Sequence, residues 1–437
     1  MDSFVLRVIA ALVLTAGTVF WTFQSIAESC EWVLPALSIL GLGLALRLGS
    51  SWSGLNLYLL PLAAALVIGW SKVPHVGTSL RHFAGASLGV QAMLLIPAFV
   101  DKSERLRLVA LAYLATAVAV VILGSTAVDP SDLSPERQQI YHLLQSNRWL
   151  PRFHLRIEGT NNGGVVNPNA LSSAVLLVLP LGLASFSLRS SHKLDLFGLK
   201  PLGAGLIAVG GLALLVFGSR TAWIAVWLVL VGALALGTMS KLWRGVVAVA
   251  IVAPLFVGLV LVASMQWSSL EGTTEDFWKT VQTRRQILSE AVVLLKGSPW
   301  VGIGLNEFRN AAQRRQGADK SVDIVHAHNV FLQTALDIGI PGLLAYCGTL
   351  VYVLRKAKEA ARGPSELARR IAVGASLSLL AVSAFGLADA VALGARVGIF
   401  HWVAAGLILA SWRIQFHSRD ELSAGMKIEG LSRPQVL

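Results

Sequence analysis

The sequence predicts an all-α, polytopic integral membrane protein with about twelve transmembrane helices. Of its 437 residues, 55% are hydrophobic and only 14% are charged, against roughly 25% charged residues in a soluble domain. Apolar runs of about 20 residues, long enough to span a bilayer, recur from end to end. The runs are continuous rather than alternating, which rejects a membrane β-barrel. The composition also excludes a soluble globular enzyme and a disordered chain.

The predicted spans follow the apolar runs in order. The first run resembles a signal peptide, but it is long and no A-x-A site follows it, so an uncleaved span is expected. Gly218-Ser219-Arg220 interrupts the longest apolar stretch. An arginine is costly at mid-bilayer, so a tight turn is expected there. The expected limits are 5–23, 33–48, 55–71, 83–100, 107–125, 168–188, 202–218, 221–237, 244–264, 329–354, 371–388 and 396–412.

The distribution of basic residues predicts the orientation. The formal net charge is +12, which on a soluble protein would suggest a nucleic-acid partner. Here the better explanation is that basic residues collect on the cytoplasmic side, so no nucleic acid is expected. With the N-terminus inside, the inward segments hold 20 Lys and Arg, and the four short outward loops hold 4. Both termini are therefore expected to be cytoplasmic.

Two long loops, 126–167 and 265–328, lie on the outward face of this topology, and residues 413–437 form a cytoplasmic tail. Loops of this length in a compact protein are usually functional. Within the second loop, apolar residues recur at helical spacing over Thr280–Lys296. This pattern predicts an amphipathic helix lying on the membrane. A second short helix is expected to start near Asn306.

Several chemical signatures are missing from the sequence. It has no P-loop, no HExxH, no GxSxG and no D-x-D motif. Glu28 and Glu31 have the wrong spacing for a metal site and are expected to be solvated acids. Cys30 and Cys347 are expected to be unpaired thiols. A reaction here should draw its energy from an activated substrate, without metal, ATP or another cofactor.

Three arginines are candidates for binding an anion. Arg220 lies at an outward turn, where it could snorkel to lipid headgroups or bind a lipid-linked phosphate through its planar fork. Arg284 and Arg285 lie on the predicted interfacial helix. They could attract anionic lipids or clamp the same phosphate.

The segment His326-Ala327-His328-Asn329 is where the second long loop meets the tenth span. Two histidines at positions i and i+2 of a helix do not share a face, so joint metal chelation requires an extended segment. One histidine acting as a general base is the better hypothesis, since its pKa is ordinarily near neutrality. Asn329 could cap the helix or orient the imidazole.

Each of the other polar candidate residues could have either of two roles. Asp337, inside the tenth span, is either functional or a structural polar contact near Pro341. Asp389, at the outer end of the eleventh span, could orient a base or pair with Arg396. Asn167 and Asn169 flank Pro168 at the start of the sixth span. Helix capping is their favoured role, with substrate binding as the alternative.

The combination of motifs is more specific than its parts. Asn167-Pro168-Asn169 and Gly218-Ser219-Arg220 each start a span, and a loop arginine precedes the run from Pro299 to Gly304. His328-Asn329 follows, and then Gly339-Ile340-Pro341-Gly342. This pattern resembles the O-antigen ligase and polymerase superfamily of bacterial envelope glycan transferases, and most of all the O-antigen ligases.

The resemblance implies an inner-membrane enzyme whose active site faces the periplasm. It would move a glycan from undecaprenyl pyrophosphate to lipid A–core, with no cofactor and with membrane lipids around it. The family's essential residues would correspond to Arg220, Arg284 and His328. Leu288 stands where the family has an aromatic residue, so the register of Arg284 and Arg285 stays open. His326, Asn329, Asp389, Asn167 and Asn169 would contact substrate.

Three alternatives remain at this stage. A polymerase would use a second lipid-linked glycan as its acceptor. A protein-glycosylating enzyme of the same superfamily usually carries a larger C-terminal extension than the tail after Arg413. A transporter should carry polar residues near mid-span in paired, broken helices, whereas here they gather at one face.

Overall fold

The computed structural model describes residues 3–22, 33–48, 53–73, 76–126, 128, 138–139, 166–186, 198–218, 220–235, 271–316, 326–389, 393–395 and 397–431. Within these ranges the protein is all-α, and an isolated bridge between Val128 and Val166 is the extended pairing observed. The helices, in chain order, are α1 (Ser3–Thr22), α3 (Val33–Leu48), α4 (Ser53–Ser71), α5 (Val76–Phe99), α6 (Ser103–Thr126), α8 (Pro168–Phe186), α9 (Leu199–Phe217), α10 (Arg220–Ala235), α12 (Glu271–Gly297), α13 (Phe308–Gln316), α14 (Val330–Ala360), α15 (Glu366–Phe385) and α16 (Gly398–Leu431).

The chain is a multi-pass membrane protein, and eleven of its twelve predicted spans coincide with described helices. The remaining one, the ninth predicted span at 244–264, lies outside the described residues. Eight of the described helices are long and apolar enough to cross a membrane, and α1 and α3 contain shorter apolar stretches. Four predicted limits were wrong by five residues or more: α5 starts at Val76 rather than 83, and α16 continues as a helix to Leu431 instead of ending near 412. In addition, α14 ends at Ala360 rather than 354, and α15 starts at Glu366 rather than 371. Hydropathy marks the apolar part of a helix, whereas the helical backbone continues into polar sequence.

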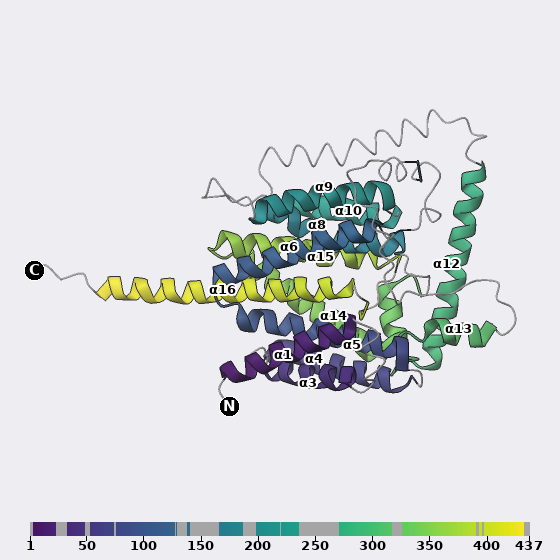
Figure 1. Cartoon of the computed structure of the whole chain (residues 1–437), viewed down its shortest axis with the longest axis horizontal. Helices are drawn as coiled ribbons and strands as arrows, with labels where there is room; N and C mark the ends of the chain where they lie inside the picture. The colour runs from purple at the N-terminus through teal and green to yellow at the C-terminus, as the bar shows by residue number, and fades with distance from the viewer. Residues whose placement is uncertain are drawn as a thin grey trace, which may run out of the picture.

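The spans lie side by side, and α12 and α13 lie at one end of the bundle (Figure 1). The start of α1 and the far end of α16 lie at the opposite end. α12 crosses the direction of the spans at a steep angle, as expected for a helix lying along a membrane surface. It covers Glu271–Gly297, which is longer than the predicted 280–296. The second short helix is α13, as predicted.

Two large apolar clusters form the core of the bundle. One joins α6, α8, α9, α10, α15 and α16, and the other joins α3, α4, α5, α14, α15 and α16. Helix α16 contributes to both, with Leu407 in the first and Ile408 in the second. A third, small cluster seats α12 and α13 against the start of α14: Ile287, Ala291, Phe308, Ala312, Ala327 and Leu336. This last cluster positions the loop arginines relative to the histidines.

Helix α14 is broken at Gly339, and the loop that connects α12 to α13 packs against the break. Gly339 has φ +77°, in the left-handed region that only glycine adopts without strain. The Ile340 N–H donates to Pro299 O at 2.8 Å, and the Ile303 N–H donates to Leu336 O at 2.7 Å. A Cβ on Gly339 would overlap the carbonyl of Trp300. The Gly339–Gly342 motif therefore serves the docking of the loop that connects α12 to α13.

Candidate active site

The segment that carries the two histidines lies against the end of α15. The Val330 N–H donates to Gly386 O at 2.7 Å. Asn329 Nδ2 donates to Leu387 O at 3.0 Å, while its Oδ1 accepts from the N–H groups of Phe331 and Leu332. Asn329 thus caps α14, as the sequence suggested, and also ties α14 to the turn that leads to Asp389.

His326, His328 and Asp389 meet at this junction. His328 Nδ1 lies 3.4 Å from Asp389 Oδ1, and His326 Nε2 lies 3.8 Å from the same oxygen. The centroids of the two imidazole rings are 4.1 Å apart. The Asp389 side chain is 2% exposed and that of His328 is 24% exposed. A buried carboxylate therefore backs an imidazole that remains accessible.

Hydrogen bonding indicates which ring nitrogen of His326 carries a proton. The Nδ1 atom of His326 accepts the backbone N–H of His328 at 3.2 Å, so a neutral His326 carries its proton on Nε2. Burial lowers the pKa of His326 to about 4, and the charges of His328 and Arg284 act in the same direction against the opposing effect of Asp389. His328 directs Nδ1 at Asp389. No hydrogen bond joins the two atoms in this structure, but a neutral ring with its proton on Nδ1 has the Nε2 lone pair available as a base.

The same three side chains are close enough to be considered as a metal site, since their ligand atoms lie within 4.8 Å of one another. A histidine that binds a metal usually donates a hydrogen bond from its second nitrogen. His326 instead accepts a hydrogen bond at Nδ1. Binding a cation through Nε2 would move the ring proton to Nδ1 and break that hydrogen bond. The donor set fits a close carboxylate–imidazole pair better than a cation.

The structure distinguishes the two neighbouring loop arginines. Arg284 is part-buried, and its Nη1 donates to Ala388 O at 3.1 Å. That carbonyl directly precedes Asp389. Arg285, one residue further along α12, is exposed. Arg284 therefore faces the histidines and Arg285 does not.

Arg220 is the first residue of α10, at the same end of the bundle. Its side chain is outside the described part of the structure, but its backbone position follows from its neighbours. The Ser172 hydroxyl, in the first turns of α8, donates to Phe217 O at 3.3 Å. Gly374 of α15 packs against Leu181 of α8, and Leu177 of α8 lines the same cavity as Val382 of α15. The two helices are therefore antiparallel, and the start of α8 lies near the end of α15. The backbone of Arg220 thus lies at the end that carries Asp389.

Asn167, directly before α8, has a local structural role. The Asn169 N–H donates to Asn167 Oδ1 at 2.8 Å, which caps the helix that begins at Pro168. This is the capping interpretation favoured by the sequence. Arg396, the other partner considered for Asp389, lies outside the described residues.

Asp337 belongs to a buried network that supports the site. Its Oδ1 accepts from Gln333 Nε2 at 2.9 Å and from the Asn306 N–H at 3.1 Å. Gln333 Oε1 in turn accepts from the Ala327 N–H at 3.0 Å. This network connects the residue between the two histidines to the loop before α13. Of the two readings of Asp337, the structural contact matches this geometry.

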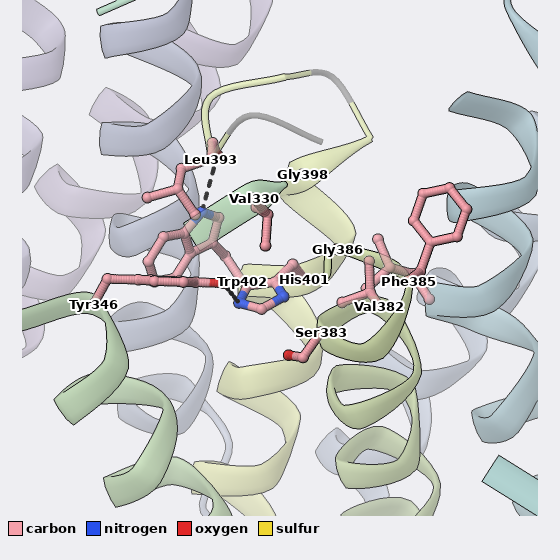
Figure 2. A pocket seen from close by; sticks show the side chains of 11 residues that line it. Val330, Tyr346, Val382, Ser383, Phe385, Gly386, Leu393, Gly398, His401 and Trp402 are labelled. Carbon is pink, nitrogen blue, oxygen red and sulfur yellow. Dashed lines mark hydrogen bonds between the residues drawn. The ribbon is translucent and has the colours of Figure 1, made fainter. Parts of the chain in front are cut away.

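A small, mostly apolar cavity adjoins the site inside the bundle (Figure 2). Val330 and Gly386, which join α14 to α15, are among its lining residues. Its volume of about 20 Å³ has room for about one water. Tyr346 Oη and His401 Nε2 lie 3.4 Å apart in its wall, and Trp402 Nε1 donates to Leu393 O. Sequence reasoning missed His401, although an ionisable residue inside a span is itself a signal.

Part of the chain matches a known protein family. Residues 204–347 match the model of the family described as O-antigen ligase. The matched segment contains Arg220, Arg284 and both histidines of the site, and it ends before Asp389. No curated protein matches the sequence significantly.

Proposed function

We propose that this chain, whose residues 204–347 match the O-antigen ligase family, is a glycosyltransferase that completes lipopolysaccharide. The donor is an O-antigen glycan on undecaprenyl pyrophosphate, and the acceptor is lipid A–core. The reaction takes place at the periplasmic face of the bacterial inner membrane. The observation that carries the proposal is the His328–Asp389 pair beside Arg284.

The proposed chemistry assigns different tasks to the arginines and the histidine. The leaving group is a lipid diphosphate, which departs without a general acid. Arg220 and Arg284 stabilise the negative charge that develops on it. His328 accepts the proton of the attacking sugar hydroxyl through Nε2. Direct displacement at the anomeric carbon inverts its configuration, and no metal takes part.

Asp389 has a positioning role in this scheme. A carboxylate that accepts from Nδ1 fixes the ring orientation and stabilises the imidazolium formed when Nε2 takes a proton. Its burial supports this role, because the Asp389–His328 interaction is shielded from water. The remaining candidates, Arg285, Asn329, Asn167 and Asn169, are proposed to contribute to substrate binding around this pair. For Asn329 and Asn167 that role would be in addition to helix capping.

Purified protein, lipid-diphosphate glycan and lipid A–core, mixed in excess EDTA, test the proposal. We expect the glycan to appear on lipid A–core with inverted anomeric configuration. Activity that disappears in EDTA and returns with Mg²⁺ or Mn²⁺ would contradict metal independence. A reaction that lengthens the lipid-linked glycan without lipid A–core would identify a polymerase instead.

The same assay separates the remaining alternatives. Transfer to an acceptor protein would identify a protein O-oligosaccharyltransferase. Movement of intact donor between the leaflets of a vesicle, without glycosidic bond formation, would identify a transporter. The clustering of Arg284, His328 and Asp389 at one end of the bundle favours transfer over transport.

A further inference from the structure

We propose that His326 is a positioning residue that holds the backbone of His328 in its active conformation through Nδ1. The inference rests on the proposed function, in which His328 is the base, and it assigns His326 a task other than substrate contact. The observation is a hydrogen bond between residues two apart in the chain: the His328 N–H donates to His326 Nδ1 at 3.2 Å.

The backbone of His328 explains why such a hydrogen bond is needed. His328 has φ +48°, in the left-handed region that side chains with a Cβ rarely occupy. Residues in that region persist at functional sites when their surroundings hold them there. Asn and Asp side chains often hold turns by accepting the N–H two residues on. His326 does the same with a ring nitrogen, and the next residue along, Asn329, begins the cap of α14.

This role requires Nδ1 of His326 to be unprotonated. Burial lowers the pKa of His326 to about 4, so the acceptor is available throughout the neutral range. The charged or titratable groups that face the ring are His328, Arg284 and Asp389. The first two oppose its protonation, and only Asp389 favours it. The environment of His326 thus preserves an acceptor rather than a charge.

The ring of His326 also contacts that of His328, with centroids 4.1 Å apart and an interplanar angle of 56°. Ring packing and hydrogen-bond acceptance are therefore two separable contributions. Asparagine places an amide oxygen the same number of bonds from Cα as Nδ1 of histidine, so His326→Asn keeps the acceptor and loses the ring. His326→Phe keeps a ring and loses the acceptor. The proposal assigns the effect on turnover to the acceptor.

The test compares these two variants in purified, folded form, with turnover and donor affinity measured separately. We expect His326→Asn to retain turnover within about threefold, and His326→Phe to lose about 10²-fold or more, as expected when base assistance is lost. Donor affinity should be unchanged in both. The acid limb of the pH–rate profile, which reports protonation of the base, should persist in His326→Asn and flatten in His326→Phe.

Three results would overturn the inference: equal loss in both variants, retained turnover in His326→Phe, or a change confined to donor affinity. Should His326→Phe fail to fold, His326→Leu removes the acceptor with a smaller side chain and takes its place. His328→Ala, measured in the same experiment, distinguishes failure of this inference from failure of the proposed function. If His328→Ala loses turnover and His326→Phe does not, the proposed function stands and this inference fails. If His328→Ala retains turnover, the base assignment itself fails.

Discussion

Nδ1 of His328 and Oδ1 of Asp389 lie 3.4 Å apart, although one residue precedes α14 and the other follows α15. Their separation is fixed by the backbone, because the Val330 N–H donates to Gly386 O at 2.7 Å between the same two segments. Such a pair differs from an exposed ion pair, whose long side chains must be ordered in water. The fold presents His328 with its partner already in place.

Asp389→Asn should impair turnover while leaving donor binding near normal. An amide cannot stabilise the imidazolium of His328 as a carboxylate does, and it can also stabilise the wrong tautomer. We expect turnover to fall by about 10²-fold or more. Asp101→Asn is the matched control, because Asp101 forms an exposed pair with Arg105 between α5 and α6. Equal turnover in the two variants would remove Asp389 from the mechanism.

Arg284 and Arg285 provide a paired test within one helix. Arg284→Gln should lower turnover by roughly 10²–10³-fold, comparable to the loss of one donor to a developing negative charge. Arg285→Gln, at the exposed neighbouring position, should change turnover only a few-fold. Initial rates with saturating acceptor, measured for both variants, would decide between them. A larger effect from Arg285 would mean that α12 rotates when substrate binds.

The pKa of His326 predicts how stability depends on pH. In the unfolded chain this group binds a proton near pH 6.5, while in the folded protein it resists protonation down to about pH 4. Between these values the unfolded state binds more protons, so stability should fall as the pH falls from 6.5 to 4. Melting temperatures in detergent should show a smaller fall for His326→Asn than for the unmodified protein. Parallel curves would show that His326 titrates normally.

Helix α12 should place one face in the outer leaflet. Leu288 and Val292 are four residues apart and are 38% and 42% exposed, and Arg285 lies beside them on the helix. An exposed apolar stripe next to basic residues is typical of interfacial helices. A polarity-sensitive dye at Leu288→Cys should be quenched by lipids spin-labelled near the headgroup. The background is a chain with Cys30 and Cys347 replaced by serine.

Gln286→Cys is the control for that experiment, because Gln286 is exposed on a different side of the same helix. The dye at this position should remain unquenched. Equal quenching at both positions, or none at either, would contradict the membrane-lying prediction for α12.

The spans were predictable because each needs only a local property, namely about 20 consecutive apolar residues. The amphipathic loop helix was predictable for a similar reason, since its apolar residues recur at helical spacing. The facing direction of Arg284 was not, because neighbouring residues on a helix point about 100° apart. Only the packing of Ile287 and Ala291 against α13 and α14 selects which arginine faces the site.

The acid–base pair was only partly predictable. Asp389 was considered both as an orienting group for a base and as a partner for Arg396, and the sequence offers no means of choosing between residues far apart in the chain. The left-handed conformation of His328 and the acceptor role of His326 have no periodic signature at all. They arise where a loop, a helix start and a helix end meet.

The most direct test of the account is the turnover of folded His328→Ala with donor affinity measured on the same preparation. Base assistance is worth about 10²–10⁴ in rate, so we expect a loss of that size with donor affinity near that of the unmodified protein. A matching melting temperature would exclude loss of structure as the cause. If folded His328→Ala binds donor normally and turns over within a few-fold of the unmodified protein, His328 is not the base, and the site acts through its arginines and substrate positioning alone.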